Sequence, residues 1–143
     1  MPLPKLSTPT YELEVPSSGK KIKYRPFLVR EEKILLLAME TEDEKQMANA
    51  VKTILANCIQ TSRFKVDNLS LFDIEYIFLN IRGKSVGENV DLTITCPDDG
   101  TTTVDVSIDL DEIKVQKSDD HTNILKLNDE ISVVMKYPSM DLF

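Results

Sequence analysis

The chain has 143 residues, of which 41% are hydrophobic and 29% are charged, and this composition predicts one folded domain and excludes a disordered acidic tail or a fibrous repeat. The formal net charge of -7 disfavours nonspecific binding of nucleic acid, because phosphate contacts need a basic surface, and it favours basic protein partners. No run of about 18 apolar residues occurs, so we expect neither a membrane span nor a secretory signal.

The N-terminal region predicts an extended arm followed by a β-hairpin. Prolines at positions 2, 4 and 9 disfavour helix, so residues 1–10 are expected to form an arm and residues 11–143 a single domain. Apolar and polar residues then alternate on both sides of a turn at 16–19. The polar face carries glutamates on the first strand and Lys21, Lys23 and Arg25 on the second, which predicts cross-strand ion pairs.

Three helices are predicted for the middle of the chain. Residues 31–40 contain strong helix formers with acids in the first turn, and their apolar run at 34–37 predicts burial on more than one side. A polar break at 41–44 separates this helix from a second one. Apolar residues recur in the second helix at helical spacing, namely Met47, Val51, Ile54, Leu55 and Cys58.

The third helix is predicted from its cap and its apolar stripe. Ser70 and Asp73 form a capping pair at its start, and Gly83 is the expected C-cap. The stripe consists of Ile74, Ile77, Phe78 and Ile81. It is predicted to face the core.

After Gly87 the period of the apolar pattern changes to two, which predicts strands. Apolar residues alternate with polar ones over 90–96 and again over 104–110, on either side of an Asp-Gly turn, and two further short strands are expected at 124–127 and 131–137. The predicted fold class is therefore α+β, with an N-terminal β-hairpin, about three central helices, and a C-terminal antiparallel β-hairpin with short strands.

Two blocks of sequence resemble the baseplate hub proteins of T4-like tailed phages. The first, residues 24–37, reads Tyr-Arg-Pro-Phe-Leu-Val-Arg-Glu-Glu-Lys-Ile-Leu-Leu-Leu, and the second spans 72–88 in the same order and at a similar separation. The resemblance runs from about Pro4 to the segment 136–139. It implies a structural subunit of a contractile-tail baseplate hub, assembled in the host cytoplasm and retained in the virion, with other baseplate and tail proteins as partners. It implies no cofactor and no small-molecule substrate.

Two other functions stay open at this stage. A transient baseplate assembly chaperone or adaptor, which leaves before the virion is complete, would share the acidic charge and the lack of a catalytic set. A small regulatory enzyme is the more distant alternative. Met140, Leu142 and Phe143 resemble the start of another apolar segment, and family members can extend further, so a continuation of the domain past Phe143 also stays open.

Two segments contain residue types that can bind metal ions. The segment 96–100, Cys-Pro-Asp-Asp-Gly, has the outline of a zinc-knuckle turn, but Asp99 stands where a second cysteine is needed, so an ordinary hairpin turn is favoured. An acidic cluster could hold calcium, or face a basic partner, or form a solvated strand face. It comprises Asp105, Asp109, Asp111, Glu112, Asp119 and Asp120. The EF-hand spacing is absent, so no metal site is predicted.

Catalytic residues are not predicted either. His121 has no nucleophile or orienting partner at a readable spacing, and it is interpreted as a surface-loop residue. Cys58 lies on an apolar helix face, where cysteines are usually inert, and both Cys58 and Cys96 are expected to be reduced.

A partner contact is predicted at residues 25–32, where a guanidinium, a proline and an aromatic ring combine features that are enriched at protein interfaces. The residues chosen are Arg25, Phe27, Glu31 and Glu32. Core packing is the alternative role for Phe27. The apolar stripe of the second helix is interpreted as core rather than as a partner groove.

Overall fold

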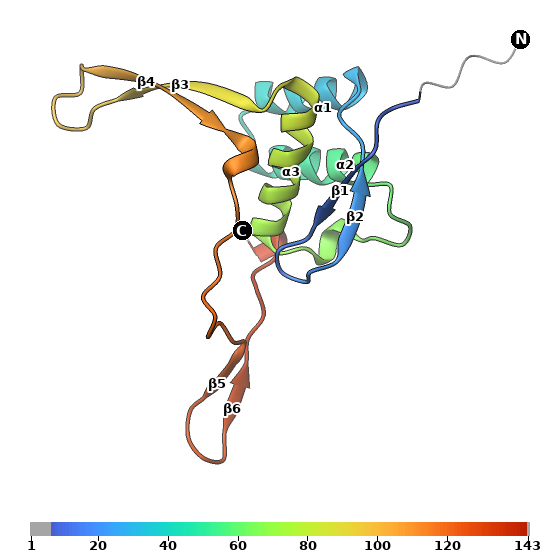
Figure 1. The fold of residues 1–143 in the computed structure, drawn as a ribbon, viewed down its shortest axis with the longest axis vertical. Coiled ribbons are helices and arrows are strands. Elements are labelled where there is room, and N and C mark those ends of the chain that lie inside the picture. The colour runs from blue at the N-terminus through green and yellow to red at the C-terminus, as the bar shows by residue number, and fades with distance from the viewer. Residues whose placement is uncertain (1–6, 143) are drawn as a thin grey trace, which may run out of the picture.

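The computed structural model describes residues 7–142, which form three α-helices, three antiparallel β-hairpins and three short 3₁₀ turns (Figure 1). In chain order the elements are β1 (Tyr11–Glu14), β2 (Lys21–Tyr24), α1 (Val29–Glu40), α2 (Glu44–Cys58), η1 (Val66–Asn68), α3 (Leu71–Val86), β3 (Asn89–Thr95), β4 (Thr103–Asp109), η2 (Leu110–Glu112), β5 (Ile124–Lys126), β6 (Ser132–Val134) and η3 (Met140–Leu142). The α+β class is confirmed. Most of the predicted N-terminal arm, residues 1–6, lies outside the described residues.

The β1–β2 hairpin has the predicted opposite charges on its polar face. Glu12 pairs with Lys23 and Glu14 with Lys21 in the register, and the Nζ atom of Lys21 lies 3.7 Å from a carboxylate oxygen of Glu12. The prediction that Arg25 continues this face is wrong. β2 ends at Tyr24, and the backbone N–H of Arg25 donates to the carbonyl of Cys58, so the Arg25 side chain turns into the protein.

The hydrophobic core joins the β1–β2 hairpin to α2, η1 and α3. Its buried members are Val15, Ile22, Tyr24, Ile54, Leu55, Cys58, Val66, Leu69, Ile74, Ile77 and Ile81. The predicted stripes of α2 and α3 therefore face this core, with Met47 and Val51 half-buried at its edge. Beyond Ile81, Leu110 is the one buried hydrophobic residue in the described part of the chain. The packed body is thus built mainly from the segment between β1 and α3, and Leu110 and Met140 pack against it from the later part of the chain.

Burial of α1 on more than one side is not observed. Ile34 and Leu35 are half-buried, whereas the side chains of Leu36 and Leu37 are both more than half exposed. Four consecutive residues point in four directions around a helix, and α1 packs through the face that carries Ala38 against α2. The apolar run therefore continues onto a free surface.

The start of α3 matches the predicted capping pair, but its end does not. The carboxylate of Asp73 accepts a hydrogen bond from the backbone N–H of Ser70 at 3.3 Å, as a cap requires. The helix continues past Gly83 to Val86, and Gly87, with φ of +140°, follows it as the C-cap. Gly83 is instead a buried helical residue that faces Leu110, and a Cβ atom there would lie 3.8 Å from Leu110 Cδ1.

These two glycines predict opposite mutational effects. Gly83→Ala is expected to raise the free energy of unfolding by about 0.5–1 kcal/mol, because glycine inside a helix is entropically unfavourable and the new methyl group makes an ordinary contact. Gly87→Ala is expected to lower it by about 1 kcal/mol, because its φ is one that alanine rarely adopts. Urea denaturation of both variants measures the difference, and shifts of the same sign would contradict this account.

Two hairpins project from the helical body in different directions (Figure 1). We call the β3–β4 hairpin, residues 89–109, the first arm and the β5–β6 hairpin, residues 124–134, the second arm. Both are distinct from the N-terminal arm predicted for residues 1–10. The first arm leaves from the C-terminal end of α3. After the second arm, the chain returns to the other end of α3, where the Leu71 N–H donates to the carbonyl of Pro138 and Ser139 pairs with Ser70.

Candidate interaction surfaces

The first arm has an apolar face that the described part of the chain leaves exposed toward the tip. The alternation places six apolar side chains on that face, in the cross-strand pairs Val90–Ile108, Leu92–Val106 and Ile94–Val104. Near the body these side chains are half-buried, but toward the tip Leu92, Ile94 and Val104 are 43–50% exposed. A hairpin of two seven-residue strands with one apolar side normally packs that side against another surface. No element within residues 7–142 covers the apolar side of this hairpin toward its tip.

The base of the first arm is fixed to α3. Leu110 is buried against Gly83, and its N–H donates to the carbonyl of Glu88. The Nζ atom of Lys84 lies 3.1 Å from a carboxylate oxygen of Asp111 and also pairs with Glu88. These contacts involve Glu88, just before β3, and Leu110 and Asp111, just after β4. The first arm is therefore held at its base, while the apolar side chains near its tip are exposed to solvent.

The second arm is apolar on both faces. Its strands pair Ile124 with Val134 and Leu125 with Val133, and these two successive pairs point to opposite faces. The exposed apolar residues of this arm and its flanks are Ile124, Leu125, Leu127, Ile131, Val133, Val134, Met135 and Tyr137. A two-stranded hairpin of this length is marginal alone, so contacts with another surface would stabilise it.

A third apolar surface lies on the outer side of α1. Val29 is 81% exposed, and Leu36 and Met39, which share its face of the helix, are more than half exposed. Contiguous exposed apolar surface of this kind marks sites of protein contact more often than scattered single residues do. The chain thus presents apolar surfaces on α1 and on both arms.

Two of the residues predicted to contact a partner form a buried ion pair. Glu31 is fully buried and Arg25 is 8% exposed, and their side chains meet in two parallel contacts of 3.1 and 3.3 Å. Glu31 also accepts hydrogen bonds from the Leu28 N–H at 2.9 Å and from Arg30 Nε at 3.0 Å. Burial would raise the pKa of Glu31, but the hydrogen bonds from Arg25, Leu28 and Arg30 outweigh it and lower the pKa to about 2.

The other two predicted contact residues lie nearer the surface. The Phe27 ring packs against Phe78, with centroids 5.9 Å apart, and the Phe27 N–H donates to the Ser85 hydroxyl. Glu32 is exposed on α1. Direct contact of these four residues with a partner stays a prediction. In the structure, Arg25 and Glu31 hold the start of α1 in place. They therefore also position the exposed apolar face of this helix.

Cys58 and His121 lie in different environments. Cys58 is fully buried in the core, and burial raises the pKa of its thiol to about 11, so the thiol is protonated at neutral pH. His121 is exposed, hydrogen-bonds through Nε2 to the Tyr137 hydroxyl, and stacks on that ring. Tyr137 in turn packs edge-on against Phe72 of α3. These rings connect the second arm to the body.

The segment 96–100 is an ordinary hairpin turn. The Gly100 N–H donates to the carbonyl of Cys96, and Asp99 accepts hydrogen bonds from the Thr102 hydroxyl and from the N–H groups of Thr102 and Thr101, which lower its pKa to about 2. Three acidic residues of the cluster have local partners: Asp105 accepts from Thr93, Asp109 accepts from the Asp111 N–H, and Asp111 pairs with Lys84. Within residues 7–142, no three His, Cys, Asp or Glu side chains gather as metal ligands would.

Comparisons with known proteins give one match. The family model described as T4 bacteriophage base plate protein matches residues 8–143. Searches of curated proteins and of solved structures returned no match. Among the residues that the structure describes, no helix is both long and apolar enough to cross a membrane.

Proposed function

The chain belongs to the T4 bacteriophage base plate protein family, and from this membership we propose that it is a non-enzymatic structural subunit of the hub of a contractile-tail baseplate. It joins the baseplate in the host cytoplasm and acts there through contacts with other baseplate proteins. The observation that carries the proposal is the pair of arms, whose apolar faces are uncovered in the isolated chain. A subunit whose work is assembly needs such surfaces, whereas an enzyme needs a cleft with convergent polar groups.

The arms suggest how the contacts form. Each arm is a hairpin with free outer edges, held to α3 at its base, so a neighbour can cover its apolar face or add a strand to its edge. Burying one such face removes several aliphatic side chains from water, at roughly 25 cal/mol for each Å² of apolar surface. The partner contact is therefore expected to form mainly through the arms and the outer face of α1.

A paired substitution tests the first arm. Ile94→Lys with Val104→Glu replaces a cross-strand apolar pair by opposite charges, which keeps the register but removes the apolar face. The matched control, Thr95→Lys with Thr103→Glu, places the same charges on the neighbouring pair of the polar face. In a phage that lacks its own copy and is complemented with each variant, we expect the first to lower recovery of this chain in particles at least tenfold and the control to leave it unchanged.

The measurement is quantitative mass spectrometry of purified particles against a tail protein of known copy number. Recovery of the wild-type chain at a small fixed ratio supports a resident subunit. Its absence from particles, with recovery in assembly intermediates, would favour the transient chaperone instead. Equal incorporation of the apolar-face variant and its control would contradict the role given to the first arm.

A further inference from the structure

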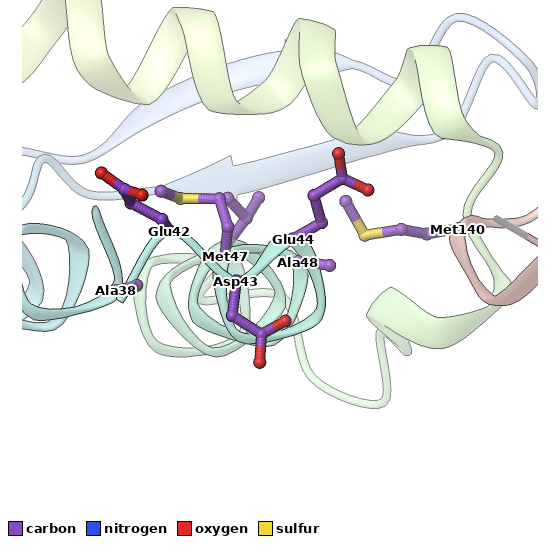
Figure 2. Close-up of a pocket in the computed structure, with 8 residues that line it drawn as sticks. Ala38, Glu42, Asp43, Glu44, Met47, Ala48 and Met140 are labelled. Carbon is purple, nitrogen blue, oxygen red and sulfur yellow. The ribbon is translucent and has the colours of Figure 1, made fainter. Parts of the chain in front are cut away.

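An apolar hollow lies where the α1–α2 turn meets the C-terminal segment (Figure 2). Its volume is about 340 Å³, near the lower end of the roughly 300–1,000 Å³ that is common for ligand pockets. The apolar lining comes from Ala38, Met47, Ala48, Val51 and Met140. Met140 reaches the hollow because the chain after the second arm is held against the start of α3. The hollow therefore joins residues that are about 100 positions apart.

The rim of this hollow is acidic. Glu42 and Asp43 lie in the turn between α1 and α2, Glu44 is the first residue of α2, and all three are exposed. Figure 2 shows the carboxylates of Glu42 and Glu44 on the same side of the turn as the sulfur atoms of Met47 and Met140, whereas the carboxylate of Asp43 points away. Asp43 has a different task, because it caps α2 by accepting from the Lys45 N–H at 2.9 Å.

Among residues 7–142, the carboxylates of Glu42 and Glu44 have no ion-pair partner. Neither carboxylate accepts a hydrogen bond in the part of the chain that the structure describes. Two uncompensated negative charges beside an apolar hollow attract a cation that carries apolar atoms. Methionine side chains suit such a site, since they are flexible and polarizable and adapt to the shape of the occupant.

From this geometry we infer that the hollow is a binding site for a lysine side chain of a neighbouring baseplate protein. The aliphatic stem of the lysine lies in the hollow and its ammonium group lies between Glu42 and Glu44, as long cationic side chains do when an apolar surface borders a charged one. The two carboxylates come from separate residues, which suits the compact charge of an ammonium better than the planar fork of a guanidinium. This inference rests on the proposed function, because it assumes a neighbour in the assembly.

Zero-length carbodiimide cross-linking tests the contact directly, because it joins a carboxylate to an amine only where the two touch. The sample is the purified phage particle or, if the chain leaves before completion, the tail intermediate that retains it. We expect Glu42 or Glu44 to be linked to a lysine of another baseplate protein. The Lys84–Asp111 pair within the chain serves as the internal calibrator, since its atoms lie 3.1 Å apart.

Ala48→Leu is the matching variant, because its larger side chain takes up part of the hollow and both carboxylates are kept. It is expected to lower the cross-link yield at Glu42 and Glu44 at least fivefold. The control, Ala56→Leu, adds the same side chain at an exposed position of the same helix and should change the yield by less than twofold.

Three outcomes would overturn the inference. They are recovery of the Lys84–Asp111 link with only unlinked Glu42 and Glu44 peptides, a link to a second copy of this chain, and a yield that Ala48→Leu does not change. Each can occur in an assembly that retains the chain through its arms. Failure of the inference is therefore distinct from failure of the proposed function, which shows as loss of the chain from both particles and intermediates.

Discussion

Replacing Glu31 by glutamine is expected to lower the free energy of unfolding by about 3–5 kcal/mol, because it leaves the Arg25 guanidinium buried without a counter-charge. Glutamine has the same length as glutamate, and its carbonyl oxygen can still accept from the Leu28 N–H. The variant thus removes the charge while it keeps the packing and the helix cap. Single domains are stable by only about 5–15 kcal/mol, so the loss is a large part of the total.

The neighbouring glutamate is the matched control. Glu32 lies one residue further along α1, also in the first turn, but its side chain is exposed. Glu32→Gln is expected to change stability by less than about 0.5 kcal/mol. Urea denaturation measures the free energy of unfolding of both variants. Equal decreases would show that the buried ion pair contributes no more to stability than the exposed Glu32 does.

A double variant separates the lost charge from other effects of the substitution. Arg25→Met with Glu31→Gln removes the stranded cation and keeps an apolar side chain of similar length. It is expected to recover at least about 1 kcal/mol relative to Glu31→Gln alone, because removing both charges of a buried pair costs less than removing one. A double variant less stable than Glu31→Gln would contradict the assignment of the loss to Arg25.

The low pKa of Glu31 also predicts how stability depends on pH. Its pKa falls from an ordinary 4.5 to about 2 on folding, so the folded state gains stability from this group above pH 4.5 and loses it as the pH falls toward 2. A shift of this size corresponds to about 3 kcal/mol. The stability difference between the wild-type chain and Glu31→Gln should therefore shrink as the pH is lowered through this range, as acid titrations of unfolding would record.

The buried Arg25–Glu31 pair could not be predicted from the alternation of apolar and polar residues. The alternation of the second strand placed Arg25 on the solvent face, but the strand ends one residue earlier, and a residue just past a strand end is no longer bound by that alternation. Two adjacent glutamates at the start of α1 look equivalent in sequence. Only the packing of α1 determines that Glu31 faces inward and Glu32 outward.

The arms illustrate the same limit for the candidate surfaces. Alternating residues predicted the strands of the first arm and the side chains that share its apolar face, since this depends on local geometry alone. Whether that face is covered depends on which elements pack over it, and this is a tertiary property. The hollow beside Met47 was harder still to predict, because Met140 enters it from the far end of the chain.

Asp73 is a second buried carboxylate that, like Glu31, caps a helix and also bonds to another segment of the chain. It is fully buried, caps α3 through the Ser70 N–H, and reaches across to accept from the Ser17 N–H at 2.9 Å in the β1–β2 turn. Glu31 likewise caps α1 and reaches back to Arg25. Each acid therefore fixes a helix start and joins it to the segment around the N-terminal hairpin. The Ser70–Asp73 spacing predicted the cap, but nothing in the sequence indicated the bond to Ser17.

Asp73→Ala is expected to lower the free energy of unfolding by about 2–4 kcal/mol. Loss of the cap on the Ser70 N–H contributes about 0.5–2 kcal/mol, and leaving the Ser17 N–H without an acceptor contributes the remainder. Asp73→Asn keeps one acceptor oxygen but turns an NH₂ donor toward the second N–H, so it should fall between alanine and the wild type. Glu75→Ala, at an exposed position of the same helix, is the control and should cost less than about 0.5 kcal/mol.

Hydrogen exchange at Ser17 distinguishes the bond across the structure from the cap alone. If Asp73 joins the β1–β2 turn to α3, the Ser17 amide should exchange faster in Asp73→Ala, under conditions where the core amides of α3 keep their protection. A Ser70→Ala variant removes the hydroxyl contact with Asp73 but keeps both N–H donors, so it should leave Ser17 protected. Unchanged exchange at Ser17 in Asp73→Ala would mean that the carboxylate acts only as a helix cap, and that packing of Val15 and Ile22 alone places the hairpin on the core.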